Sequence, residues 1–106
     1  DIDGLMIPFV SHSGIEPVYH IFPTLLPAGM DRLKVIEVLK REGVQSSIHY
    51  PEFQEFTAFR GGKLEATPIA QEIAKRELTL PLYPTMTDEE VNIVIAAFRL
   101  ALQEGR

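Results

Sequence analysis

The stretch DRLKVIEVLKREGVQSSIHY, residues 31–50, contains the signals for a helix and, directly after it, a strand. Asp31 can accept hydrogen bonds from the N–H groups of a first helical turn. Gly43 suits the left-handed residue that follows a last turn. The spacing between these two positions predicts a helix, whose stripe contains Leu33, Val35, Ile36, Val38, Leu39 and Lys40.

Residues 44–50 alternate as a strand does, because successive side chains of a strand point to opposite faces. One face then carries Val44, Ser46, Ile48 and Tyr50, and the other carries Gln45, Ser47 and His49. Burying three polar side chains without partners would be costly. We therefore expect the face with His49 to be more exposed than the face with Val44 and Ile48, which should pack on helices.

Two more segments are typical of strands. Residues 18–26, VYHIFPTLL, are rich in β-branched and aromatic side chains. Pro23 within them has no N–H to donate, so this strand lies at an edge of the sheet or directs position 23 outward. Residues 78–82, LTLPL, predict a short third strand.

Two more helices follow from their start signals. Thr67 and Pro68 form an N-cap followed by proline at the first helical position, and this helix is expected to reach about Arg76 and to bury Ile69, Ala70 and Ile73. Thr87 and Glu90 form a capping box. The last helix should reach about Glu104, with one face made of Val91, Val94, Ile95, Phe98 and Leu102.

The order of these elements predicts an α+β fold. A small, mostly antiparallel or mixed sheet of about three strands would have the helices packed on one face. The 106 residues suffice for a single domain over 1–106. Residues 1–17 are expected to form an extended lead-in, and residues 51–66 a loop in which Phe53, Phe56 and Phe59 form a small satellite cluster.

Composition excludes several classes of protein. The net charge is −5, and an acidic domain without a basic patch is not expected to bind nucleic acid. The absence of cysteine excludes disulfides and thiolate metal sites. No apolar run approaches the roughly 20 residues that span a bilayer, and the first residues lack the basic region of a secretory signal. We expect a cytoplasmic protein that does not contact a membrane.

Most candidate sites have a simpler structural explanation. His12, Glu16 and His20 are four residues apart, as metal ligands on a helix would be, but Gly14 and Pro17 interrupt such a helix, so a loop is the favoured interpretation. Gly61-Gly62-Lys63 lacks the spacing of a phosphate-binding loop. His49 and Tyr50 remain as a polar and aromatic pair where a strand meets a loop, a place where sites are common.

Four segments, taken together, resemble the C-terminal small domain of the DegT/DnrJ/StrS family of pyridoxal-phosphate (PLP)-dependent nucleotide-sugar aminotransferases, which have fold-type I. They are VYHIFPTLLP (18–27), Arg32 at the start of a helix, LKREGVQSSIHYPEF (39–53) and ELTLPLYPTMTDEEV (77–91). Their order and spacing match over residues 15–104. The chain begins at Asp1 and not at methionine, which fits a piece of a longer protein or a processed one.

The resemblance implies substrate contacts at His49, Tyr50 and Gln54. In the family, the end of this strand faces the cleft in which the sugar binds. The family often has HYPP-x-H here, whereas this sequence has Glu52 for the second proline and Gln54 for the second histidine. Glutamine can hydrogen-bond a hydroxyl but cannot shuttle a proton near neutral pH, so the substrate and the reaction can differ from the family pattern.

The resemblance also implies what lies outside this chain. A large domain of the same polypeptide would supply the Schiff-base lysine and hold PLP, and the whole enzyme would be a homodimer that acts on a nucleotide-sugar substrate. None of the chain's lysines, which are Lys34, Lys40, Lys63 and Lys75, matches the family's lysine motif. We therefore expect residues 1–106 alone to be inactive and to bind no PLP.

Two alternatives stay open at the level of sequence. The chain can be a stand-alone binding or regulatory domain that comes from a truncated gene and has no catalytic role. It can also belong to a sibling PLP enzyme of the same fold, such as a dehydratase.

Overall fold

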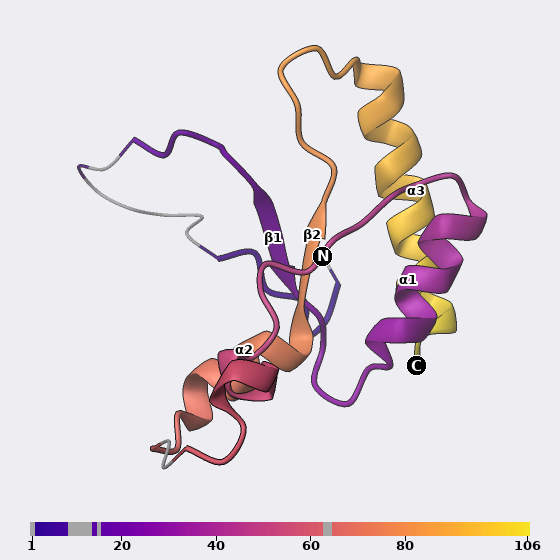
Figure 1. Ribbon diagram of the computed structural model, residues 1–106. Coiled ribbons are helices and arrows are strands. Elements are labelled where there is room, and N and C mark those ends of the chain that lie inside the picture. Colours follow the sequence, from indigo (N-terminus) through magenta and orange to yellow (C-terminus); the bar gives the residue numbers. More distant parts are fainter. Residues whose placement is uncertain (1, 9–13, 15, 63–64) are drawn as a thin grey trace.

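Three α helices and a two-stranded antiparallel sheet form the part of the chain that the structure describes (Figure 1). This computed structural model describes residues 2–8, 14, 16–62 and 65–106. The α+β class is confirmed. The elements are β1 (Phe22–Leu25), α1 (Arg32–Arg41), the 3₁₀ helices η1 (Phe53–Glu55) and η2 (Thr57–Phe59), α2 (Pro68–Arg76), β2 (Glu77–Leu80) and α3 (Asp88–Glu104).

The sheet pairs β1 with β2 in antiparallel register, with Phe22 opposite Leu80. The strand expected over 78–82 is thus β2. Single bridges add one residue on each side of the sheet, at Met6 and at Ser47. Met6 belongs to the expected lead-in 1–17. The described residues of this lead-in form no helix and make a single bridge, the one at Met6. Residues 1, 9–13 and 15 lie outside the described residues.

The strand predicted over residues 44–50 is wrong, because this segment meets β2 at a single pair. Ser47 and Thr79 exchange both backbone hydrogen bonds, with N···O distances of 3.1 Å and 2.8 Å. The segment runs beside β2 but forms no continuous ladder. The sheet therefore has two strands where about three were expected.

Both neighbouring positions of this ladder are blocked. In an antiparallel pair the hydrogen-bonded positions recur every second residue, so Gln45 would pair with Pro81 and His49 with Glu77. Pro81 has no N–H to donate. The His49 N–H donates instead to the side-chain carboxylate of Glu77, at 2.7 Å. The pairing of this segment with β2 therefore ends on both sides of the single pair at Ser47 and Thr79.

Pro23 removes no hydrogen bond from the sheet. It lies opposite Thr79 in the register, and Thr79 directs its N–H and its C=O at Ser47 on its other side. The pair formed by Pro23 and Thr79 is therefore a non-hydrogen-bonded one. This confirms the expectation that position 23 directs its missing donor outward, in a strand that is shorter than the 18–26 predicted.

Helix α1 has the ends that the sequence predicts. The Asp31 Oδ1 accepts from the N–H groups of Leu33 and Lys34 at 3.0 Å and 3.2 Å. Gly43 has a φ of +77°, in the left-handed region, which suits glycine at this position. The buried residues of the helix are Val35, Val38 and Leu39. Leu33, expected in the buried stripe, is 70% exposed.

Helix α3 packs on α1 through its second half. Its N-terminus has the predicted capping box between Thr87 and Glu90. The buried residues are Ala97, Phe98, Ala101 and Leu102. Val91 and Ile95, which were expected on the buried face, are exposed, because the first turns of α3 extend past the end of the shorter α1 (Figure 1).

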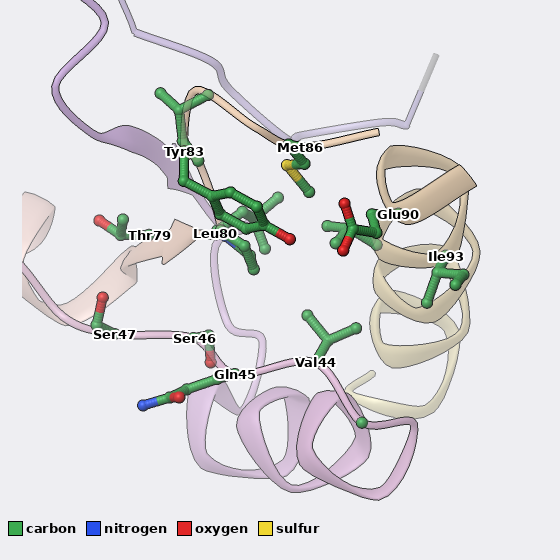
Figure 2. Close-up of a pocket in the computed structure, with 14 residues that line it drawn as sticks. Val44, Gln45, Ser46, Ser47, Thr79, Leu80, Tyr83, Met86, Glu90 and Ile93 are labelled. Carbon is green, nitrogen blue, oxygen red and sulfur yellow. The ribbon is translucent and has the colours of Figure 1, made fainter. Parts of the chain in front are cut away.

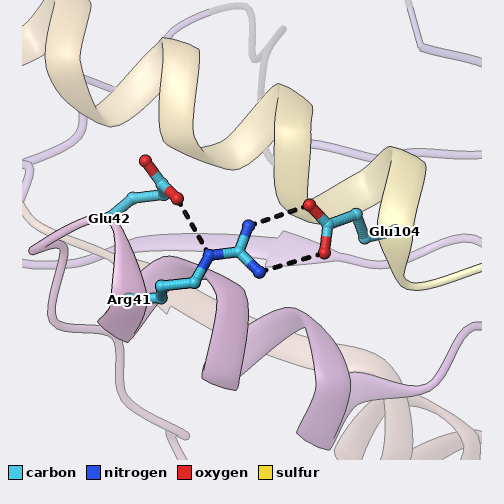
Figure 3. A network of polar contacts seen from close by, with 3 residues as sticks. All are labelled: Arg41, Glu42 and Glu104. Atoms are coloured by element: carbon cyan, nitrogen blue, oxygen red, sulfur yellow. Dashed lines mark hydrogen bonds and ion pairs between the residues drawn. The ribbon is translucent and has the colours of Figure 1, made fainter.

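The α1 and α3 ends are also joined at the surface by Arg41 (Figure 3). Its guanidinium binds the Glu104 carboxylate through two contacts, of 2.8 Å and 3.2 Å, and Glu42 at 3.0 Å. The hydrogen bond from Arg41 lowers the pKa of Glu104. Because these side chains are exposed, the contact orients the two helices more than it stabilises them.

The sequence predicts the position of helix α2 correctly, but the buried face that it predicts for this helix is wrong. None of its residues is buried, and Ile69 is 77% exposed. The helix runs directly into β2, so it lies at the end of the sheet and not on the face that α1 and α3 cover (Figure 1). The expectation that all helices share one face is therefore wrong for α2.

The two faces of β2 differ in chemistry. Leu78 and Leu80 belong to the core that α1 and α3 cover. Side chains alternate along a strand, so Glu77 and Thr79 point to the opposite face. The core thus lies on one side of the sheet, and a polar pair lies on the other.

We predict that Leu39→Ala lowers the free energy of unfolding by about 2–5 kcal/mol, because it leaves a cavity in a fully buried site. Leu33→Ala, on the same helix, should change it by no more than about 0.5 kcal/mol, because the side chain is exposed. Urea unfolding followed by circular dichroism measures both. Equal losses for the two variants would contradict the observed packing of α1.

Candidate functional site

Glu77, Thr79 and His49 form a hydrogen-bonded network on the polar face of β2. The Thr79 hydroxyl donates to the Glu77 Oε1 at 2.5 Å. The other carboxylate oxygen, Oε2, accepts from the backbone N–H of His49 at 2.7 Å. The Nδ1 atom of His49 lies 3.0 Å from the Thr79 Oγ1. Glu77 and Thr79 are only 4% and 5% exposed, so the network is shielded from water.

The predicted alternation of residues 44–50 holds up to Ile48. Val44 is buried, while Gln45 and Ser47 are exposed. His49 and Ile48 are both half-buried, so His49 is less exposed than expected. Tyr50, expected on the face of Val44, is 73% exposed. The alternation is lost after the single pair at Ser47, because no further ladder bond fixes the face of the next residues.

The His49 and Tyr50 rings contact each other edge to face. Their centroids are 5.1 Å apart and their planes meet at 82°. The Tyr50 ring is thus placed at the surface beside a half-buried imidazole. A polar and aromatic pair of this kind can hold a ligand that has both a ring face and hydroxyl groups.

Gln54 is engaged within the chain. Its Nε2 donates to the carbonyl of Glu65 at 3.0 Å, and its Oε1 accepts from the Gln71 Nε2 at 2.6 Å. These contacts tie the segment of η1 to α2. Substrate binding by Gln54 stays a prediction, and it would require this amide to exchange partners.

A groove of about 440 Å³ brings Tyr50 and Gln54 together. The other residues that line it are Pro51, Glu52, Phe53 and Phe56 from the aromatic segment, and Thr67, Ala70, Gln71 and Ala74 from α2 and its cap. Phe53 packs edge to face on Phe59, with centroids 5.6 Å apart. His49 does not line this groove, so the three predicted substrate residues do not share one pocket.

A second cavity, of about 570 Å³, lies where the segment 43–47 meets β2 and the start of α3 (Figure 2). Thr79 lines it, which joins the cavity to the network described above. The Ser46 Oγ also lies in its wall and is buried, without a hydrogen-bond partner among the described residues. Tyr83 and Glu90 face each other across the cavity (Figure 2).

Tyr83 and Glu90 shift one another's acidity. Hydrogen bonding to Glu90, whose charge opposes a tyrosinate, raises the pKa of Tyr83. The pKa of Glu90 is lowered, first by the Thr87 backbone N–H, which donates at 2.8 Å, and then by the Tyr83 hydroxyl. The carboxylate is therefore held in its charged form at one side of the cavity.

Among the described residues, no cluster of metal ligands is found and no lysine lines either of the two pockets above. The described residues contain no group of three or more histidine, aspartate or glutamate side chains that could hold a metal ion. Of the trio weighed in the sequence, Glu16 and His20 are exposed, and His12 lies outside the described residues. Lys34, Lys40 and Lys75 are exposed on helices and line neither pocket, and Lys63 lies outside the described residues.

No helix in residues 2–8, 14, 16–62 and 65–106 combines the length and the apolar character that a membrane crossing requires.

Sequence reasoning missed Glu77 and Thr79. Their signal was the period-two pattern of ELTL, which sets this polar pair against Leu78 and Leu80. Residues 44–50 were expected to form part of the same sheet as ELTL. The polar face with His49 could therefore have been matched with the polar face of Glu77 and Thr79. The pairing could not be fixed without the register of Ser47 on Thr79.

A sequence model of the "DegT/DnrJ/EryC1/StrS aminotransferase family" matches residues 1–99. One similar protein is "dTDP-4-dehydro-2,3,6-trideoxy-D-glucose 4-aminotransferase" from Saccharopolyspora spinosa, 29% identical over 97% of this chain and 26% of its own length. The chain spans between 26% and 29% of the length of three curated relatives that it matches.

Solved structures also resemble the chain, in fold as well as in sequence. The aminotransferase TlmJ from Streptoalloteichus hindustanus superposes with a TM-score of 0.84 at 26% identity, over 96% of this chain and 27% of TlmJ. Spr1654 from Streptococcus pneumoniae, solved in a PLP form, superposes with a TM-score of 0.72 at 26% identity, over 82% of this chain and 23% of its own.

We predict that Glu90→Gln lowers the pKa of Tyr83, because it removes the negative charge that opposes tyrosinate formation. Glutamine still completes the capping box, so the helix should start as before. With three tyrosines and no tryptophan in the chain, ultraviolet titration compared with a Tyr83→Phe variant isolates the Tyr83 signal. Glu89→Gln is the control, and an equal midpoint in both variants would argue against the contact.

Proposed function

The chain belongs to the DegT/DnrJ/EryC1/StrS aminotransferase family, and we propose that it is the C-terminal small domain of a PLP-dependent aminotransferase that acts on a nucleotide-linked keto sugar. The observation that carries the proposal is the superposition of 96% of the chain on 27% of the aminotransferase TlmJ, with a TM-score of 0.84. Nearly the whole chain matches about a quarter of an enzyme. This supports the proposal that the chain is one part of a larger enzyme.

The substrate class rests on a relative. The S. spinosa protein is named for a dTDP-linked 4-dehydro sugar and for the 4-amino group that it introduces. A keto sugar on a nucleotide offers hydroxyl groups and a carbonyl for hydrogen bonding. The imidazole of His49 and the exposed ring of Tyr50 are groups that can contact such a sugar from this domain.

The cofactor would be held elsewhere. Spr1654 is solved with PLP, whereas Lys34, Lys40 and Lys75 of this chain are exposed on helix surfaces. PLP supplies the electron sink for amino transfer when it is bound. We propose that a large domain of the same polypeptide holds it, within a homodimer, and that this chain contributes substrate contacts.

Exposed apolar side chains support a partner of that kind. Helix α2 has no buried residue, and Ile69 and Ile73 are 77% and 44% exposed. Phe53 and Phe56 next to it are also exposed. Apolar surface gathered in this way is typical of an interaction site, and a large domain of the same polypeptide would cover it.

We predict that a longer protein containing this chain shows Schiff-base absorbance with PLP and transfers an amino group from glutamate to a dTDP-linked 4-keto sugar. Residues 1–106 alone should form no borohydride-reducible adduct on a single stoichiometric lysine, because no described lysine lines the groove at Tyr50 or the cavity at Thr79. Mass spectrometry after reduction measures the adduct. An adduct on one lysine of the short chain, or a longer protein without transfer, would count against the proposal.

A second prediction concerns His49 in the longer enzyme. His49→Ala should lower kcat/KM by about tenfold or more, because a positioned contact to the substrate is lost. It should cost about 1 kcal/mol of stability, which is typical of one hydrogen bond. Gln45→Ala, exposed on the same segment, is the control and should leave kcat/KM unchanged. A large fall in melting temperature with full activity of the folded fraction would make His49 a structural residue.

A further inference from the structure

We propose that Glu77 and Thr79 are positioning residues that hold His49 in the tautomer with the proton on Nδ1, so that Nε2 faces the substrate as a hydrogen-bond acceptor. The assignment of the tautomer rests on the hydrogen-bond network alone. The part that concerns the substrate rests on the proposed function.

The carboxylate of Glu77 accepts a hydrogen bond at each of its two oxygens. A backbone N–H can only donate, and that of His49 points at the Oε2 atom from 2.7 Å. An ionised carboxylate only accepts, and it can do so at both oxygens. With 4% of its surface exposed, Glu77 draws its donors from the protein, and the Thr79 hydroxyl is the donor at Oε1.

The hydroxyl of Thr79 lies between Glu77 and the His49 ring. A hydroxyl has one proton and can donate only one such bond, while its oxygen still accepts. The proton lies in the short contact of 2.5 Å to Glu77. The Oγ1 atom is therefore an acceptor toward the His49 Nδ1 atom, 3.0 Å away. The Nδ1 atom must then carry a proton.

The proton on Nδ1 also fixes the state of the other ring nitrogen, Nε2. A neutral imidazole has one N–H donor and one bare nitrogen, so Nε2 is the bare one. It has no hydrogen bond to any residue that the structure describes. Histidine in water prefers the opposite tautomer, so the network reverses the ordinary preference of the ring. A buried carboxylate sets the tautomer of an imidazole in hydrolase triads by the same logic.

This assignment selects what His49 can bind. An acceptor nitrogen takes a donor group, such as a sugar hydroxyl or an amine, and not a phosphate or carbonyl oxygen. A neutral His49 in this tautomer would also accept a proton at Nε2 and not release one there. The network thus favours a hydroxyl or an amino group of the sugar as the partner of His49, and not its nucleotide phosphates.

The direct test is to determine the tautomer of His49 by long-range ¹H–¹⁵N correlation spectra of residues 1–106, at a pH at which the ring is neutral. The chain has three histidines, and a His49→Gln variant identifies the His49 signals. We expect the pattern of an Nδ1–H tautomer for His49 in the unmodified chain. The Nε2–H pattern there would overturn the inference, because it would require Thr79 to donate to the ring.

Two matched variants separate the hydroxyl from the packing. Thr79→Val keeps the shape but removes the hydroxyl and should return His49 to the Nε2–H tautomer, while Thr79→Ser keeps the hydroxyl and should retain Nδ1–H. The amide spectrum of each variant reports whether the fold is kept. If Thr79→Val fails to fold, the unmodified chain and Thr79→Ser still decide between the tautomers.

The longer enzyme provides the functional arm. Thr79→Val should lower kcat/KM by about tenfold and Thr79→Ser by no more than about twofold, and the loss from Thr79→Val should vanish in a His49→Gln background, since the two residues act as a unit. A full loss in that background would contradict a role through His49. If the tautomer is Nδ1–H but the longer protein transfers no amino group to keto sugars, the proposed function fails and the tautomer assignment stands.

Discussion

The hydrogen bond from the His49 backbone N–H to the Glu77 carboxylate, 2.7 Å long, decides where the sheet ends and where the His49 ring lies. A third strand would have used that N–H for the Glu77 carbonyl. The carbonyl accepts instead from the Arg32 guanidinium at 3.0 Å. Both ladder groups at this position are thus taken by side chains, so the segment 44–50 can turn away from β2.

Glu77 joins the elements that surround the candidate site. Arg32 is the first residue of α1, and its guanidinium also donates to the carbonyl of Ala74 in α2. Through Arg32, Glu77 links α1 to the junction of α2 and β2, and through its side chain it holds the backbone of His49 and the hydroxyl of Thr79. The backbone of Glu77 therefore holds α1 through Arg32, while its side chain holds the site, so a substitution of Glu77 would remove the contacts to His49 and Thr79 but keep the carbonyl that Arg32 binds.

Much of the fold could be read from the sequence because the signals were local. Asp31, Gly43 and the box of Thr87 and Glu90 depend only on neighbouring residues, and each is found where it was expected. The buried faces were less predictable. Val91 and Ile95 fit the helical period of α3, but nothing in that period says how far α3 extends past α1.

The site could be predicted only in part. Ile69 and Ile73 have the spacing of a buried face, yet α2 leaves them exposed, because it lies at the end of the sheet and not on the face that α1 and α3 cover (Figure 1). His49 was identified, but its partners were not, because a single pair at Ser47 and Thr79 sets which residues meet. The lost alternation at Tyr50 has the same cause, since it follows from Pro81 and Glu77 interrupting the ladder.

The most direct test of this account is the hydrogen-bond acceptor of the His49 amide. A long-range HNCO spectrum of the ¹³C,¹⁵N-labelled chain detects the carbon across a hydrogen bond, and a carboxylate carbon is distinct in shift from a backbone carbonyl carbon. We expect a correlation from the His49 amide to the side-chain Cδ of Glu77. A correlation to the backbone carbonyl carbon of Glu77 would mean that the ladder continues, and it would contradict both the two-stranded sheet and the placement of the His49 ring.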